Sequence, residues 1–137
     1  MKDINNPLIK AYYDAISPLY PTFEGEEPDN ILDKLYVVIS DVSSNDTSTK
    51  SSADVNAQIQ ITINSWENKY NNSKAMNDAA GAILEAIKPD PNAVLILSGM
   101  QMLNLRVSHD RVQNYGNLAG RVYISRQIIF TQDIFIL

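Results

Sequence analysis

The chain has 137 residues, of which 45% are hydrophobic and 20% charged, and its formal net charge is −5. These values are typical of one globular domain and exclude a disordered chain. The absence of cysteine excludes disulfides and thiolate metal sites, and the acidic balance disfavours a dedicated nucleic-acid-binding domain.

The first predicted element is a helix over residues 7–16. Its apolar residues recur at helical spacing: Leu8, Ile9, Tyr12, Tyr13 and Ile16. Pro7 suits the first helical position, and Ser17-Pro18 ends the helix because proline disfavours the α conformation in the residue before it. Residues 19–34 contain two prolines and several carboxylates, which predicts an irregular surface loop.

Residues 35–40 (LYVVIS) predict a short strand buried on both faces, which ends at Asp41. Residues 43–54 contain no large apolar side chain, so we expect a mobile polar loop or a hairpin arm there. The strands on either side of it can still pair, because the entropic cost of closing a loop grows slowly with its length.

The clearest strand begins at Val55, where apolar and polar residues alternate strictly through Asn64. One face holds valine, alanine and isoleucine and belongs to the core. The other holds Asn, Gln and Thr and ends at Trp66, so we expect it to meet solvent, a partner or a lumen. A helix follows over residues 75–87, capped by one of the residues 71–73 and stopped by Pro89 and Pro91.

The last third predicts strands at 94–97, 102–107 and 121–131, with a polar turn or loop at 109–120. Residues 134–137 (IFIL) form a separate apolar tail, which either closes the sheet of its own chain or docks on a neighbour. The predicted order is α-β-β-α-β-β-β. We therefore expect residues 1–137 to form a single α+β domain, with a mostly antiparallel sheet and two main helices packed on one face.

Catalytic, metal and cofactor signatures are weak throughout. His109 beside Asp110 is the one candidate for acid–base chemistry, as in a small hydrolase. Neighbouring side chains of an extended segment point to opposite faces, which favours a solvated histidine instead. We predict no cofactor, no metal site and no phosphate-binding loop.

Contacts with other molecules are better supported, because the charges are segregated along the chain. All four arginines lie between residues 106 and 126, and carboxylates gather between residues 24 and 33. These two segments are candidates to pair across an interface between copies. The candidate interface residues are Glu24, Glu26, Glu27, Trp66, Arg106, Arg111, Arg121, Arg126, Ile134, Phe135, Ile136 and Leu137.

The chain resembles the tail-completion, or tail-terminator, proteins of tailed bacteriophages. The residues that carry the resemblance are YYDAI in the first helix, then LYVVISDVSSND, then AQIQITINSWENKYNNSKAMNDAAGAILEAI, and finally GRVYISRQIIF. In that family a strand ending in a small polar residue and Trp leads through a short loop into a helix. The resemblance spans about residues 7–130.

The resemblance implies a structural virion protein without enzymatic activity, assembled in the host cytoplasm. We expect no membrane association, because no stretch approaches the roughly 20 apolar residues of a membrane helix. It implies a homo-oligomeric ring, commonly a hexamer and alternatively a dodecamer, that joins the head connector and portal-side proteins to the tail and lets DNA pass. A neck or portal ring of a short-tailed phage is an alternative, because residues 43–54 and 134–137 depart from the family pattern. A monomeric adaptor or inhibitor and a hydrolase using His109 and Asp110 are the rivals from other classes.

Overall fold

The computed structural model describes residues 4–25, 35–46, 54–68, 74–118 and 121–136. The elements in chain order are α1 (Asn5–Ile16), β1 (Thr22–Glu24), β2 (Leu35–Asp46), β3 (Asp54–Asn68), α2 (Lys74–Ile87), β4 (Met100–Leu118) and β5 (Arg121–Ile136).

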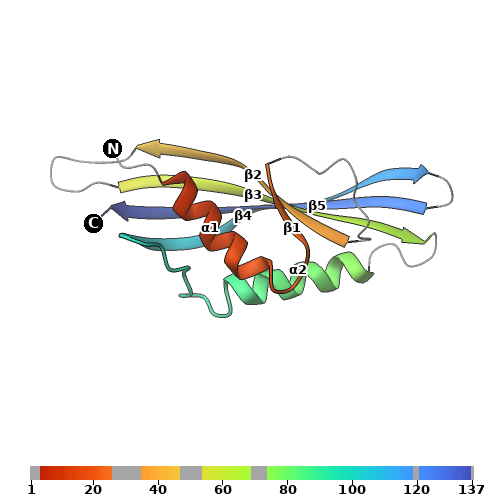
Figure 1. Ribbon diagram of the computed structural model, residues 1–137, viewed down its shortest axis with the longest axis horizontal. Helices are drawn as coiled ribbons and strands as arrows, with labels where there is room; N and C mark the ends of the chain where they lie inside the picture. Colours follow the sequence, from red (N-terminus) through yellow and green to blue (C-terminus); the bar gives the residue numbers. More distant parts are fainter. Residues whose placement is uncertain (1–3, 26–34, 47–53, 69–73, 119–120, 137) are drawn as a thin grey trace.

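The strands form one sheet in the order β1-β2-β3-β5-β4. β1 runs parallel to β2, and every other pair of neighbours is antiparallel. Both helices lie on the same side of this long, narrow sheet (Figure 1). The structure therefore confirms the predicted α+β class, with a mostly antiparallel sheet covered by helices on one face.

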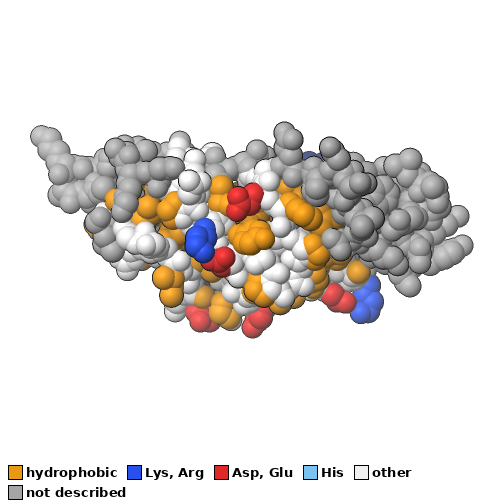
Figure 2. Space-filling view, viewed as in Figure 1, with side chains coloured by type: hydrophobic (Ala, Val, Ile, Leu, Met, Phe, Trp, Pro, Cys, Tyr) orange, Lys and Arg blue, Asp and Glu red, His pale blue; other side chains and the backbone are white. Residues whose placement is uncertain are grey.

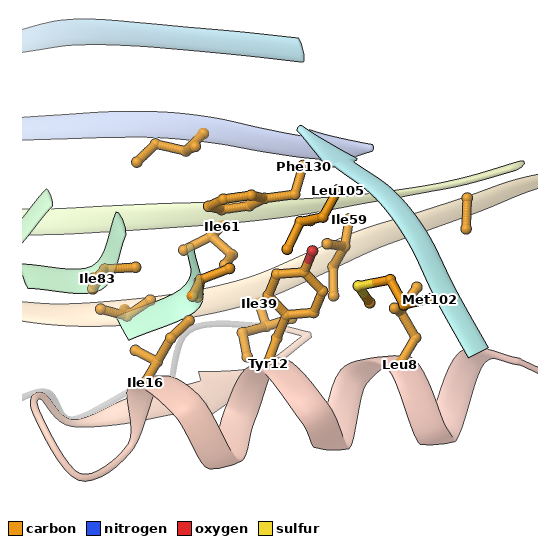
Figure 3. Close-up of a cluster of buried hydrophobic side chains, with 14 of the residues drawn as sticks. Leu8, Tyr12, Ile16, Ile39, Ile59, Ile61, Ile83, Met102, Leu105 and Phe130 are labelled. Atoms are coloured by element: carbon orange, nitrogen blue, oxygen red, sulfur yellow. The ribbon is translucent and has the colours of Figure 1, made fainter. Parts of the chain in front are cut away.

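The core lies between the two helices and the inward side of the sheet. The alternation predicted for β3 is confirmed. Its valine, alanine and isoleucine side chains are fully buried, whereas most of the polar side chains between them are half-buried or exposed. Leu8, Tyr12 and Ile16 project from α1 toward the sheet (Figure 3). The helix predicted over residues 75–87 is also confirmed as α2, which buries Met76, Ala79, Ala80, Ile83 and Ile87.

The predicted loop over residues 19–34 contains a strand that the sequence analysis missed. Thr22–Glu24 pair in parallel with Val37–Ile39 of β2. Phe23 packs edge-on against Tyr36, with ring centroids 6.2 Å apart. This strand is too short and too close to two prolines to show a pattern of its own, and residues 26–34 lie outside the described part of the chain.

The predicted strand at 35–40 is confirmed as buried on both faces, but Asp41 does not end it. β2 continues to Asp46 after an irregularity between Ser40 and Ser43. Both ends of the polar segment predicted at 43–54 therefore belong to strands, β2 and β3, which agrees with the alternative of a hairpin arm. Polar residues can extend the two strands there because β2 and β3 pair with each other on either side of the connecting segment. Residues 47–53 lie outside the described part of the chain.

Two predictions for the last third are wrong, and the apolar tail follows one of its two alternatives, which is to close the sheet of its own chain. Val94–Leu97 is not a strand, because Leu97 makes only an isolated bridge to Met100 and the Leu95 N–H meets the sulfur of Met102 at 3.4 Å. The polar segment from His109 is strand, since β4 continues to Leu118. The tail at 134–137 is not separate: β5 runs through Ile136 and buries Ile134 completely.

Candidate assembly surface

The side of the sheet away from the helices, here called the open face, carries the polar residues of β3. Gln58 is exposed, and Asn56, Gln60 and Thr62 are half-buried. Their partners across β5 are also mainly uncharged, because Gln60 lies opposite Ile129 and Thr62 opposite Gln127. The open face is thus a neutral surface of amides and hydroxyls along its centre.

The sequence suggested that this face is polar and exposed along its whole length. The structure shows that one end of it is buried. Asn64 and its cross-strand partner Ser125 are both buried within the chain. Trp66 lies further along β3 opposite Tyr123, and its side chain is outside what the structure describes. The polar side chains of β3 that reach solvent therefore end at Thr62, before the buried Asn64.

Two arginines and a histidine lie on the open face along the edge strand β4. Arg106, His109 and Arg111 lie opposite Thr131, Ile129 and Gln127, which are successive same-face positions on β5. All three are exposed. We call Arg106, His109 and Arg111 the basic row.

A β-bulge aligns the basic row. Residues 106 and 109 would point to opposite faces of a regular strand, but the register shifts between Val107 and His109 and leaves Ser108 as the extra residue. Ser108 Oγ donates a hydrogen bond to the carbonyl of Ile129 (3.2 Å) and accepts one from Thr131 Oγ1 (2.8 Å). These bonds tie the bulge to β5.

A second irregularity lies between Leu103 and Arg106. Asn104 adopts a positive φ of 54°, a conformation that asparagine tolerates better than most residues. Asp133 accepts hydrogen bonds from the side-chain amides of Asn104 and Asn56, each at 2.9 Å. These bonds, first that from Asn104, lower the pKa of Asp133 below its usual range.

Arg126, a predicted interface residue, is occupied within its own chain. It lies on the helix side of β5, opposite Ile63 of β3. Its Nε and Nη2 donate to the two carboxylate oxygens of Asp110 at 2.8 and 2.6 Å, and Nη1 donates to Asn77 of α2 at 3.2 Å. The hydrogen bonds from Arg126 lower the pKa of Asp110. Arg126 therefore joins three elements and is not available to an acidic partner.

The other predicted interface residues are dispersed. Glu24 is exposed on β1, and Arg106 and Arg111 are exposed on β4. Phe135 and Ile136 are half-buried beside the fully buried Ile134, so this segment closes its own sheet. The remaining side chains lie outside what the structure describes: Glu26, Glu27, Trp66, Arg121 and Leu137.

Exposed apolar side chains are a feature that the sequence analysis missed. Ile96 is 93% exposed and Val112 53%, and Leu103 and Val107 join Val112 on the edge strand β4. Ile96 also borders a groove of about 400 Å³ that runs between residues 91–97 and 100–105 and contains no charged residue. The sequence alone does not show which apolar residues of these segments stay outside the core, because that depends on how the segments pair with the sheet.

Within the described residues, the two candidate catalytic groups, His109 and Asp110, are not brought together. His109 lies on the open face, whereas Asp110 lies opposite the buried Ile128 and bonds Arg126 on the helix side. Among the described residues no three His, Asp or Glu side chains gather as metal ligands. Neither described helix is long and apolar enough to cross a membrane.

Comparison with known proteins gives a match in fold but not in sequence. No family model matches the chain, and no curated protein is significantly similar to it. Among the solved structures that match is a chain of the virion of a native gene transfer agent particle. The two superpose with a TM-score of 0.76 over 98% of this chain and 99% of that one, at 15% sequence identity. The fold is therefore shared from end to end.

Proposed function

We propose that this chain is a structural protein of a phage-like virion, placed at the neck or at the head-proximal end of the tail. The observation that carries the proposal is the end-to-end fold match, at a TM-score of 0.76, to a chain of a gene transfer agent virion. The order of elements shared with tail-terminator proteins supports the finer assignment. In this role the chain assembles in the host cytoplasm and contacts the head connector and the tail.

The proposed working form is a homo-oligomeric ring, commonly a hexamer in proteins of this kind and alternatively a dodecamer. A ring needs a heterologous contact, in which two different surfaces of each copy meet. The edge strand β4 offers one such surface, because Val107 and Val112 are exposed there without apolar neighbours in the sheet beyond them. Ile96 offers a second exposed apolar group on another segment.

The open face is the proposed lining of the ring. Its centre presents amides and hydroxyls rather than charges. Affinity for DNA depends mainly on lysine and arginine contacts with phosphates, so a neutral lining lets DNA move past it. The helix side carries carboxylates with lysines beside some of them (Figure 2), including the pairs Lys10–Asp14 and Lys74–Asp78, and is the proposed outer surface.

The proposed role is not enzymatic. The division of His109 and Asp110 between the two faces of the sheet, with Asp110 held by Arg126, supports a structural role over a hydrolase. Substituting His109 with alanine is expected to leave assembly unchanged.

Location in the particle tests the proposal. Purified virions are analysed by mass spectrometry for this chain and then imaged with gold-labelled antibodies against it. We expect the chain in the virions and the label at the junction of head and tail. Absence from the virions, or label spread over the capsid, would contradict the proposal.

Substitution of exposed apolar residues tests the ring contact. Replacing Ile96 and Val112 with serine is expected to reduce the mass of the particle in solution, because both side chains leave water on assembly. Leu19→Ser is the matched control, since Leu19 is 45% exposed and is not on either proposed surface. Equal loss of mass in the control would argue against these surfaces.

A further inference from the structure

The basic row has a regular spacing. Because its members lie opposite successive same-face positions of β5, neighbours are about 6.7 Å apart along the strand, twice the rise per residue. Each strand of a DNA duplex carries one phosphate per about 3.4 Å of helix axis. Measured along the DNA helix axis, one step of the basic row therefore corresponds to about two phosphates of one strand.

We infer that the basic row, Arg106, His109 and Arg111, is a contact line for the phosphate backbone of double-stranded DNA. The inference deepens the proposed function and rests on it for the source of the DNA. The ligand is recognised by its evenly spaced negative charge and not by its sequence, because phosphate contacts carry no base information.

The surroundings of the row suit a polyanion. Asp133 is the one carboxylate among the open-face side chains that the structure describes, and its oxygens already accept hydrogen bonds from Asn56 and Asn104. The flanking Gln127 is neutral and half-buried, and amides donate hydrogen bonds to phosphate oxygens in protein–DNA complexes. The hydroxyl of Thr131 is buried and donates to Ser108 instead.

The charges of the two sides differ, although the chain is acidic overall. On the helix side two lysines pair with aspartates at 2.8 and 3.0 Å, and Glu85 and Asp90 are exposed. Arg126 is neutralised by Asp110. Among the described ion pairs none involves Arg106 or Arg111, but the charge of Arg106 helps to lower the pKa of Asp133 on the same face. Two arginines against one carboxylate leave the described part of the open face with a positive balance.

The bulge at Ser108 is the structural reason for the row. Without it Arg106 and Arg111, five residues apart, would point to opposite sides of the strand. Bulges often re-aim a side chain beside a functional site, and this one is tied to β5 by two hydrogen bonds of Ser108.

The contact is expected to be weak. Each neutralised phosphate adds about 0.9 to the slope of log affinity against log salt. Two arginines thus add a slope of about 2 for each chain that touches DNA. Such contacts guide DNA along the proposed ring lining without holding it.

Binding of the purified full-length protein to a fluorescent duplex of about 30 base pairs tests the inference, between about 50 and 200 mM salt. We expect the double variant R106Q/R111Q to bind at least tenfold more weakly at the lower salt and to lose about 2 from the slope. The matched control K10Q/K74Q removes the same charge from the helix side and is expected to bind like the wild type. Thermal melting and solution mass are measured for all three proteins.

Three results would overturn the inference. The double variant binding like the wild type would exclude the row as the contact. An equal loss in K10Q/K74Q would show that only net charge matters. A change of solution mass in R106Q/R111Q, without a change in DNA binding, would show that the arginines meet an acidic surface of another copy. A wild type that never forms rings but binds DNA through the row would instead refute the proposed function alone.

Discussion

Gln132 is a polar residue at a core position of β5, and its contacts explain why it is tolerated there. It is fully buried, accepts a hydrogen bond from the Tyr12 hydroxyl at 2.5 Å, and donates one to the carbonyl of Ala57 at 2.8 Å. Burial raises the pKa of the Tyr12 hydroxyl, which therefore stays a neutral donor. The pair connects α1 to two neighbouring strands.

Tyr12→Phe is expected to lower the free energy of unfolding by about 1–3 kcal/mol, because Gln132 then keeps an unsatisfied buried oxygen. Tyr13→Phe is the control, since Tyr13 lies beside Tyr12 on α1 and is only half-buried. Urea unfolding of the three proteins measures the difference. Equal stabilities of the two variants would show that the hydroxyl of Tyr12 does not matter.

The Asp110–Arg126 ion pair predicts a pH dependence. The pKa of Asp110 is lowered in the folded chain, so its contribution is complete above the unfolded pKa of about 4 and is lost as the pH falls through the lower folded value. Asp110→Asn is expected to cost about 1 kcal/mol at pH 7, a value reduced for partial exposure, and less below pH ~3. Urea unfolding at both pH values checks this, and a constant difference would contradict it.

Residue-level roles were the hardest to foresee from sequence. Arg126 was predicted as an interface residue, but its partners Asp110 and Asn77 come from β4 and α2 and are not predictable from spacing. The basic row was likewise hidden, since only the bulge at Ser108 places its members on one face.

At the scale of elements, small residues set the distance between α2 and the sheet. Ala79 and Ala80 are fully buried against the core, whereas Ala75, one turn earlier, is exposed. Ala79→Leu is therefore expected to destabilise the fold by about 1–3 kcal/mol through overpacking, and Ala75→Leu by less than about 0.5 kcal/mol. Thermal melting checks this, and similar melting temperatures would contradict the close approach of α2.

The sequence predicted elements well where at least one face is buried and poorly where neither is. β3 alternates because the core covers one side of it, and α2 shows its stripe for the same reason. The second half of β4 has exposed residues on both sides from Arg106 to Val112, so hydrophobicity leaves no pattern there. The prediction for Val94–Leu97 was wrong for the opposite reason. This apolar run has the composition of a strand, but in the structure it has no strand to pair with beyond the isolated bridge of Leu97.

At the scale of the whole molecule, the described strands leave the sheet open at both edges. β1 covers β2 only over three pairs, and β4 has a neighbour on one side only. Exposed edges invite pairing with another chain, and the irregularities of β4 limit this to specific partners. That residues 1–137 form one domain stays a prediction, and the end-to-end match to the virion chain shows a shared fold.

The mass of the purified protein in solution tests this account most directly. Light scattering over a range of concentrations, alone and after addition of tail-tube or connector protein, is expected to give a closed multiple of the 15.3 kDa chain, with rings visible in electron micrographs. A particle of 15.3 kDa under every condition, without rings on addition of either partner, would contradict the assembly role.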